Sequence, residues 1–266
     1  MELQDLKSKS VGLVLSGGGV KGVAHIGLIQ ALDEYGIQAD YVSGASVGAL
    51  VGALYANGNP VMEMLSFFKK VPLFQYHFFA RHKPGLFDTE KYVPIFKQYF
   101  PENSFEGLQR RLFVTTTNLQ KGVQEQFSTG ELIKPLLASA ALPPVFSPLE
   151  INGYLYADGG IMNNFPLDVI RERCNFVIGS NVSAVKEVGR ESIRTSLQLA
   201  GRTTSLMIYA INLERVKECD LVFEPKELDK IGVLDKRGME LAYTIGYTNA
   251  REVLEREFGK QPVAES

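Results

Sequence analysis

The sequence predicts an α/β fold with a mostly parallel central sheet and helices on both faces, a three-layer α/β/α arrangement. Short, nearly continuous apolar runs, which are typical of strands buried on both faces, alternate with helical patterns along the chain. The first two of these runs end in glycine-rich turns that open directly into helical segments. Both observations favour strand–helix units over an all-helical or all-β fold.

The elements follow in a regular order. We expect parallel strands at 11–16, 40–44, 111–118, 176–182 and 220–225, with helices starting at about Val20 and Ser46. The runs 122–129 and 151–160 follow turn signals at Lys121-Gly122 and Asn152-Gly153, and are predicted as antiparallel or edge strands. Long helices are expected at about 191–215 and 237–258.

Length and composition indicate one globular domain. The 266 residues are 45% hydrophobic and 22% charged, enough for one large core. We place that domain at 11–258, with a polar lead at 1–10, a polar tail at 259–266 and a helical, aromatic-rich insertion at about 60–107. The net charge of −2 gives no global basic field, so no nucleic-acid partner is expected.

The compartment is predicted to be the cytoplasm. Cys174 and Cys219 form neither a metal-ligand pattern nor a disulfide framework, and are interpreted as buried small hydrophobic residues. The N-terminus lacks the apolar segment of a secretory signal, and the longest strongly apolar stretch, Val47–Ala56, is too short to span a bilayer. Any membrane contact is therefore expected to be peripheral.

The first glycine turn fits more than one kind of site. Gly17, Gly19 and Gly22 satisfy G-x-G-x-x-G between a strand and a helix, as a dinucleotide site requires. That site also needs an acidic residue at the end of the second strand, whereas Asp40 stands at its beginning. A nucleotide P-loop fails too, because no Lys-Ser or Lys-Thr follows the glycines.

The second glycine turn carries a candidate nucleophile. The sequence from Gly44 to Gly48 matches the G-x-S-x-G nucleophile elbow, with Ser46 at its centre and the required strand before it and helix after it. Glycines on both sides remove the Cβ atoms that would collide in so tight a turn. The alternative is that Gly44, Gly48 and Gly52 only allow close helix packing.

No histidine stands where a hydrolase triad would place its base. The three histidines, His25, His77 and His82, all precede the motif Asp158-Gly159-Gly160. His25 shares a helical face with apolar residues and is interpreted as a core histidine, and the other two as surface or lid residues. A carboxylate remains as the candidate base, and Asp158 follows a strand pattern; an ordinary Asp-Gly turn is the alternative.

Taken together, these motifs resemble the patatin-like phospholipase family, especially its compact bacterial members. The residues that carry the resemblance are "GGGVKG" at 17–22, "GASVG" at 44–48, "SAALPPVFSPLEINGYLYADGG" at 139–160 and "NNFP" at 163–166. The resemblance implies a catalytic dyad of Ser46 as nucleophile and Asp158 as general base, without cofactor or metal. It further implies an oxyanion hole of backbone N–H groups at Gly17, Gly18 and Gly19, with supporting motif residues Lys21, Gly22, Gly44, Gly48, Gly159 and Gly160.

The function implied is a serine acyl hydrolase of the phospholipase A, lysophospholipase or lipid esterase type, working through an acyl-enzyme. The partner would be a lipid or other acyl ester. Two alternatives remain open: an acyltransferase that uses the same acyl-enzyme, and a non-catalytic lipid-binding protein. The Lys21 ammonium is expected either to favour an anionic headgroup or the oxyanion, or to be plainly solvated.

The insertion contains a candidate membrane contact. Phe67, Phe68, Phe74, Phe78 and Phe79 stand among the cations Lys69, Lys70, Arg81 and Lys83, a composition typical of an interfacial lid. The alternative is that these rings pack over the core or at a subunit contact. The oligomeric state does not follow from the sequence.

Overall fold

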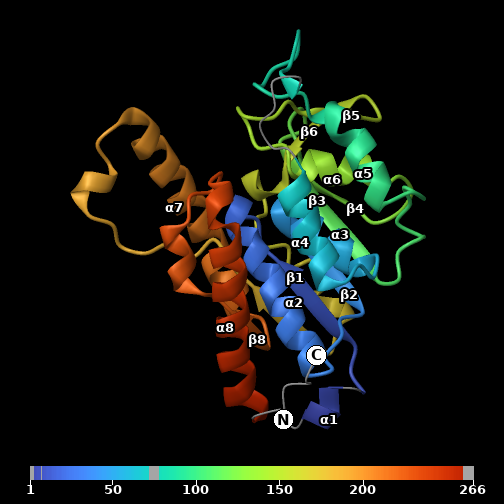
Figure 1. Ribbon diagram of the computed structural model, residues 1–266. Helices are drawn as coiled ribbons and strands as arrows, with labels where there is room; N and C mark the ends of the chain where they lie inside the picture. The colour runs from blue at the N-terminus through green and yellow to red at the C-terminus, as the bar shows by residue number, and fades with distance from the viewer. Residues whose placement is uncertain (1–2, 7, 72–77, 260–266) are drawn as a thin grey trace.

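The computed structural model of the chain describes residues 3–6, 8–71 and 78–259 (Figure 1). These residues form an eight-stranded sheet with the strand order β5-β6-β3-β2-β1-β7-β8, and β4 pairs with β3 outside this path. The strands are β1 (Val11–Leu15), β2 (Tyr41–Ala45), β3 (Arg111–Asn118), β4 (Val123–Phe127), β5 (Leu149–Ile151), β6 (Tyr154–Asp158), β7 (Phe176–Ser180) and β8 (Leu221–Phe223).

The sheet confirms the predicted α/β fold. The neighbouring strands β3, β2, β1, β7 and β8 all pair in the parallel sense. The two antiparallel additions are also present, since β4 pairs with β3, and β5 with β6. The turn expected at Asn152-Gly153 joins β5 to β6, with φ of 51° and 81° at its two residues.

Strand β6 brings its last residue to the end of β2. Thr115 of β3 pairs with Ala45 of β2 on one edge and with β4 on the other. The next residue, Thr116, pairs with the same β4 and with Asp158 of β6. Because a strand has only two edges, β6 continues along the edge where β2 stops. Asp158 therefore lies next to the residues that follow Ala45.

Helices and loops cover both faces of the sheet. On one face lie α2 (Ala24–Glu34), α3 (Val47–Ala56) and α8 (Met239–Phe258), with α8 packed along α2 (Figure 1). On the other face Val14 and Val177 are buried under Phe165, Ile170 and the last turn of α7 (Ser196–Lys217). The molecule is thus built in three layers.

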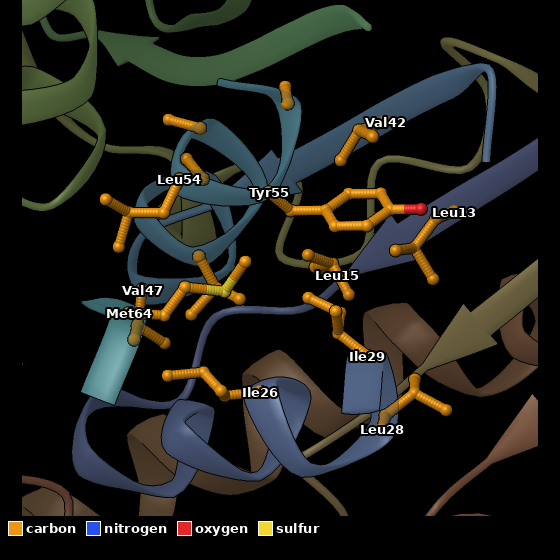
Figure 2. Close-up of a cluster of buried hydrophobic side chains, with 14 of the residues drawn as sticks. Leu13, Leu15, Ile26, Leu28, Ile29, Val42, Val47, Leu54, Tyr55 and Met64 are labelled. Carbon is orange, nitrogen blue, oxygen red and sulfur yellow. The ribbon is translucent and has the colours of Figure 1, made fainter. Parts of the chain in front are cut away.

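The main core fixes the helices that start at the carboxyl ends of the strands. Figure 2 shows side chains of β1 and β2 packed against those of α2, α3 and α4 (Val61–Lys70). The labelled residues are Leu13, Leu15, Ile26, Leu28, Ile29, Val42, Val47, Leu54, Tyr55 and Met64, all buried. Burial of large apolar side chains contributes roughly 1.5–3 kcal/mol each. The N-termini of α2 and α3 are therefore held firmly at one edge of the sheet.

Several elements differ from the sequence predictions. Two helices were not expected: α1 (Leu3–Leu6) and α6 (Ile133–Ser139). α7 begins at Ser196, later than the predicted 191, because Thr195 and Gln198 form a capping box that sets its start. The 3₁₀ turns are η1 (Gly19–Val23), η3 (Thr89–Tyr92), η4 (Gly159–Ile161), η5 (Arg171–Arg173), η6 (Arg190–Ser192), η7 (Lys226–Lys230) and η8 (Lys236–Gly238).

The segment 60–107, which the sequence analysis treats as a helical insertion, is helical in part. It contains α4, η3 and α5 (Val93–Tyr99), and the last two pack against α6. His77 and Phe74 lie outside the described residues, as does most of the predicted polar tail.

The proposed aromatic membrane contact is wrong for two of its five rings, Phe67 and Phe78. Phe67 and Phe78 are buried in the core, and Phe68 packs against that core. The Phe67 ring makes edge-to-face contacts with the rings of Phe68 and of Phe96 in α5. The ring centroids are 5.1 Å and 5.3 Å apart, respectively. Only Phe79 of the four described rings is exposed, at 42%. The aromatic residues therefore serve mainly to fasten the insertion to the core.

Two described helices, α7 and α8, have 18 or more residues. Neither contains a stretch apolar enough to cross a membrane.

Candidate active site

Ser46 occupies a strained turn between β2 and α3. Its φ of 53° and ψ of −130° lie outside the regions that non-glycine residues ordinarily adopt. A Cβ on Gly48 would come within 2.2 Å of the Leu15 carbonyl oxygen, and one on Gly44 within 2.6 Å of the Ala49 nitrogen. Both glycines are therefore required by close backbone contacts, and the turn has the shape of a nucleophile elbow.

Asp158 lies directly beside this serine. The Ser46 Oγ donates a hydrogen bond of 2.7 Å to Asp158 Oδ2. The other carboxylate oxygen, Oδ1, accepts a 2.7 Å hydrogen bond from the Gly160 N–H. The Thr117 hydroxyl donates to the Asp158 carbonyl oxygen at 2.9 Å and so holds the backbone in place. Two residues that are 112 positions apart thus form one hydroxyl–carboxylate pair.

The environment of Asp158 changes its acidity. Only 3% of the residue is exposed, and no cation forms a salt bridge with its carboxylate among the described residues. Burial raises the pKa of Asp158 to about 6, although the hydrogen bonds from Ser46 and Gly160 act in the opposite direction. A carboxylate with this pKa is a considerably stronger base than an exposed aspartate.

The glycine turn after β1 stands against the same serine. A Cβ on Gly17 would come within 3.0 Å of Ser46 Cβ, which shows how closely the two turns approach. The Gly17 N–H donates to the Asn164 carbonyl oxygen at 3.1 Å, so it is not free for a substrate. The N–H groups of Gly18, the N-cap of η1, and of Gly19, its first residue, have no hydrogen-bond partner among the described residues. These two amides are the free donors of the turn.

Asn164 joins the glycine turn to the loop that follows Asp158. The Asn164 Oδ1 would lie 2.3 Å from a Cβ on Gly17 and 2.6 Å from one on Gly160, so both glycines make room for the amide. Its Nδ2 donates to the Ser183 Oγ at 3.1 Å, and the Ser183 hydroxyl hydrogen-bonds to the Gly17 carbonyl oxygen. Asn164 therefore braces both motif loops.

His25 is a core residue, as the sequence indicated. It is completely buried in α2, where Nε2 lies 2.9 Å from the Ser16 carbonyl oxygen and Nδ1 lies 2.8 Å from Ser180 Oγ. A carbonyl can only accept, so Nε2 carries the proton and Ser180 donates to Nδ1. Burial lowers the pKa of His25 to about 4, which keeps the ring neutral. It supports the residue just before the glycine turn.

Lys21 is neither solvated nor a partner of Ser46 in this structure. Its largely buried ammonium lies 3.8 Å from Asp229 Oδ1 in η7. Burial lowers the pKa of Lys21, Asp229 opposes this effect, and the nearby charge of Arg202 in α7 lowers it slightly further. The ion pair ties the glycine turn to η7.

Ser139 is a site residue that the sequence analysis did not single out. Its buried hydroxyl, at the end of α6, donates to the Thr115 carbonyl oxygen at 2.6 Å and accepts from the Ser46 N–H at 2.9 Å. It thereby holds the strained elbow in place. Ser139 is the first residue of the motif segment 139–160, so the sequence did contain a signal for it. Nothing in the local sequence, however, distinguishes its hydroxyl from that of any other buried helical serine.

The remaining motif glycines also make close contacts. A Cβ on Gly22 would come within 2.2 Å of a Val47 methyl carbon, and one on Gly159 within 2.1 Å of the Thr115 carbonyl oxygen. Throughout residues 3–6, 8–71 and 78–259, no group of three or more His, Cys, Asp or Glu side chains could hold a metal ion.

Comparison with a family model gives a match that spans both motif turns and the aspartate loop. A model described as patatin-like phospholipase matches residues 13–171. Among solved structures, VipD from Legionella pneumophila is similar with a TM-score of 0.57 and 18% identity, covering 93% of this chain and 67% of that one. At that identity the similarity concerns the fold alone.

Curated relatives include fungal proteins named lysophospholipase NTE1. The protein of Candida glabrata is 30% identical over 190 residues, which cover 68% of this chain and 11% of the relative. The Neurospora crassa relative is 28% identical over 299 residues, covering 98% of this chain and 19% of the relative. The chain therefore spans only a small part of the length of these proteins.

Proposed function

The chain belongs to the patatin-like phospholipase family, and from this premise we propose that it is a lipid acyl hydrolase that works through a Ser46–Asp158 dyad. The observation that carries the proposal is the 2.7 Å hydrogen bond from Ser46 Oγ to a buried carboxylate, made from a strained elbow. Because the similar fungal proteins are named lysophospholipases, we propose lysophospholipids as the substrate class.

Acylation follows from this geometry. Asp158 Oδ2 removes the proton as Ser46 Oγ attacks the ester carbonyl carbon, and the carbonyl electrons move onto its oxygen. The free N–H groups of Gly18 and Gly19, at the start of η1, stabilise that oxyanion. The tetrahedral intermediate collapses, the alcohol leaves with the proton from Asp158, and the acyl group remains on Ser46.

Deacylation repeats these steps with water. Asp158 takes a proton from a water molecule that attacks the acyl carbonyl carbon, and the same N–H groups stabilise the second oxyanion. The bond to Ser46 Oγ then breaks and the serine recovers its proton from Asp158. One carboxylate thus serves as base and acid in turn, which a pKa of about 6 permits near neutral pH.

Substitution of either member of the dyad tests the proposal. We expect Ser46→Ala and Asp158→Asn to lower kcat/KM for a soluble short-chain ester by about 10⁴-fold or more, because the nucleophile or its base is lost. Ser128→Ala, which alters an exposed serine after β4, is the matched control and should retain full activity. Circular dichroism and thermal unfolding establish that each variant is folded.

Covalent labelling separates the alternatives. A fluorophosphonate should label the wild-type protein and the Ser128→Ala variant, but not the Ser46→Ala variant. Failure to label folded wild-type protein, together with measurable lipid binding, would favour a non-catalytic lipid-binding protein. Transfer of the acyl group to an added alcohol in preference to water would favour an acyltransferase.

A further inference from the structure

The outward face of α7 is apolar along most of its length. Leu199, Leu206 and Leu213 are seven residues apart and so lie on one helical face. Met207 and Ile211 widen this face to one side. These five side chains, which we call the α7 apolar face, are between 39% and 68% exposed. Surface residues of this type are common singly, but a continuous set on one helix indicates a contact surface.

The inward side of the helix carries polar residues as well as the core residue Val216. Asn212 is completely buried, and neither its Oδ1 nor its Nδ2 has a hydrogen-bond partner among the described residues. Arg215, on the same side, is held by contacts with the loop that follows Asp158. A surface helix of a globular protein normally turns its leucines inward and its polar residues outward. In α7 the exposed Leu199, Leu206 and Leu213 point outward instead, and this favours an apolar environment outside the protein.

The distribution of charge favours a lipid surface. No Asp, Glu, Lys or Arg occurs between Thr203 and Leu213. At the N-terminal end of α7 and in the loop before it, the cations Lys186, Arg190, Arg194 and Arg202 outnumber the anions Glu187 and Glu191. An apolar helical face bordered by arginines is the pattern of helices that bind in the plane of an anionic membrane.

The position of α7 relates this face to the candidate active site. Near its C-terminal end, the Arg215 Nη1 hydrogen-bonds to Asn163 Oδ1 and lies 3.8 Å from Asp168 Oδ1, in the loop after Asp158. Nearer its N-terminal end, the Arg202 charge acts on Lys21 in the glycine turn. Figure 1 shows α7 standing out from the body of the protein. The helix therefore contacts the loop after Asp158 directly, and its Arg202 lies close enough to the glycine turn for the charge to act on Lys21.

We propose that the α7 apolar face docks the protein on an anionic lipid surface and thereby brings the Ser46–Asp158 site to lipid substrates. This inference rests on the proposed function for the source of the substrate. A second copy of the chain is the competing occupant. The α7 apolar face is wider than the two-position seam of a helix pair, because Met207 and Ile211 extend it to one side of the leucines, and this width favours a membrane over a partner helix.

Vesicle sedimentation tests the docking directly. The probes are phosphatidylglycerol vesicles and phosphatidylcholine vesicles, and every protein carries Ser46→Ala so that hydrolysis cannot alter the lipid. We expect binding to phosphatidylglycerol that weakens with salt, and at least a tenfold loss of partitioning in a Leu206→Glu/Met207→Glu double variant. Met62→Glu changes a methionine on α4 that is 74% exposed, and this matched control should bind normally.

Three outcomes would overturn the inference. One is the absence of vesicle binding by the folded protein, and another is equal loss of binding in the Met62→Glu control. The third is a concentration-dependent dimer in analytical ultracentrifugation that the α7 double variant abolishes, with no vesicle binding; the occupant would then be a second copy.

A soluble ester distinguishes this inference from the proposed function. With Ser46 restored, the double variant should hydrolyse a short-chain soluble ester at the wild-type rate while its rate on vesicle lipid falls at least tenfold. Vesicle binding without any hydrolysis would leave the docking surface standing and contradict the proposed function. Hydrolysis of the soluble ester without vesicle binding would support the proposed function and contradict the docking surface.

Discussion

At the scale of single residues, the candidate site depends on what burial does to one carboxyl group. Asp158 is nearly inaccessible, and the loss of water around its charge raises its pKa to about 6. The neighbouring hydroxyl of Ser46 and the N–H of Gly160 keep the charged form accessible. The balance gives a base that is mostly ionised at pH 7 yet strong enough to take a proton from a hydroxyl.

The pH dependence of hydrolysis is the first prediction. Because Asp158 must be ionised to act as a base, kcat/KM for a soluble ester should rise with pH through about 6 and then level off. Between pH 7 and pH 5 we expect a decrease of about tenfold, measured in initial rates with folding checked at each pH. A flat profile across this range would contradict the assignment of Asp158 as the base.

At the scale of elements, close contacts of helix α3 with the sheet position the elbow. Gly48 allows the first turn of α3 to approach the end of β1, where a Cβ would stand 2.2 Å from the Leu15 carbonyl oxygen and 2.6 Å from that of Ser16. Backbone atoms on both sides leave little room for relaxation. A Cβ on Gly52, one turn later, would meet side chains and no backbone among its three nearest atoms. These belong to Val42, Leu112 and Leu15, at 3.0 Å or more.

Two alanine substitutions on this one helix form the second prediction. Gly48→Ala should lower the free energy of unfolding by about 3 kcal/mol, since it overpacks a rigid backbone contact, and should also depress activity by displacing Ser46. Gly52→Ala should change stability by less than about 1 kcal/mol, because better helix propensity offsets a mild contact. Urea denaturation measures both. An equal loss of unfolding free energy in the two variants would contradict the prediction, because the close contact of Gly48 with the Leu15 carbonyl would then not determine stability.

At the scale of the whole molecule, residues distant in sequence hold the glycine turn from several sides. His25 of α2 supports the Ser16 carbonyl and reaches Ser180 at the end of β7. From the far end of the chain, the Val233 carbonyl oxygen accepts a 2.8 Å hydrogen bond from the Val20 N–H. The position of the turn therefore depends on most of the fold.

The acid sensitivity of the fold is the third prediction. The folded-state pKa of His25 is about 4, below its usual 6.5, so the unfolded chain takes up the proton first as pH falls. The stability that neutral His25 contributes is present above pH 6.5 and is lost as pH falls toward about 4. Between pH 7 and pH 5 the loss of this His25 contribution to the free energy of unfolding amounts to about 2 kcal/mol. Denaturant unfolding at the two pH values, compared between the wild type and a His25→Gln variant, measures this contribution.

A glutamine variant isolates this effect. His25→Gln keeps a neutral side chain with a hydrogen-bond donor, so it should be less stable than wild type at pH 7 but should lose about 2 kcal/mol less on going to pH 5. His82→Gln, at an exposed position, is the matched control and should follow wild type. Both variants retain Asp158, whose raised pKa contributes in the opposite direction. Parallel pH profiles for all three proteins would contradict the prediction.

Much of the fold could be predicted from the sequence because its strands are marked locally. Five buried strands of the parallel sheet lie within apolar runs, and the elbow around Ser46 was predicted from glycines that its tight turn requires. The helix α6 was missed because its seven residues are too few for a periodic pattern. The aromatic residues of the insertion were misassigned in part, because composition does not tell an exposed ring from a buried one.

The sequence by itself determined which chemical groups this protein possesses: a serine in an elbow, an aspartate before two glycines, a glycine turn and no histidine after that aspartate. Only the tertiary structure decided how they meet. It took the continuation of β6 beyond β2 to bring Asp158 within 2.7 Å of Ser46. It took the Asn164 carbonyl to occupy the Gly17 N–H, while the amides of Gly18 and Gly19 have no partner among the described residues. The physical reason is that hydrogen bonds and burial depend on distances between residues far apart in the chain, which local patterns do not encode.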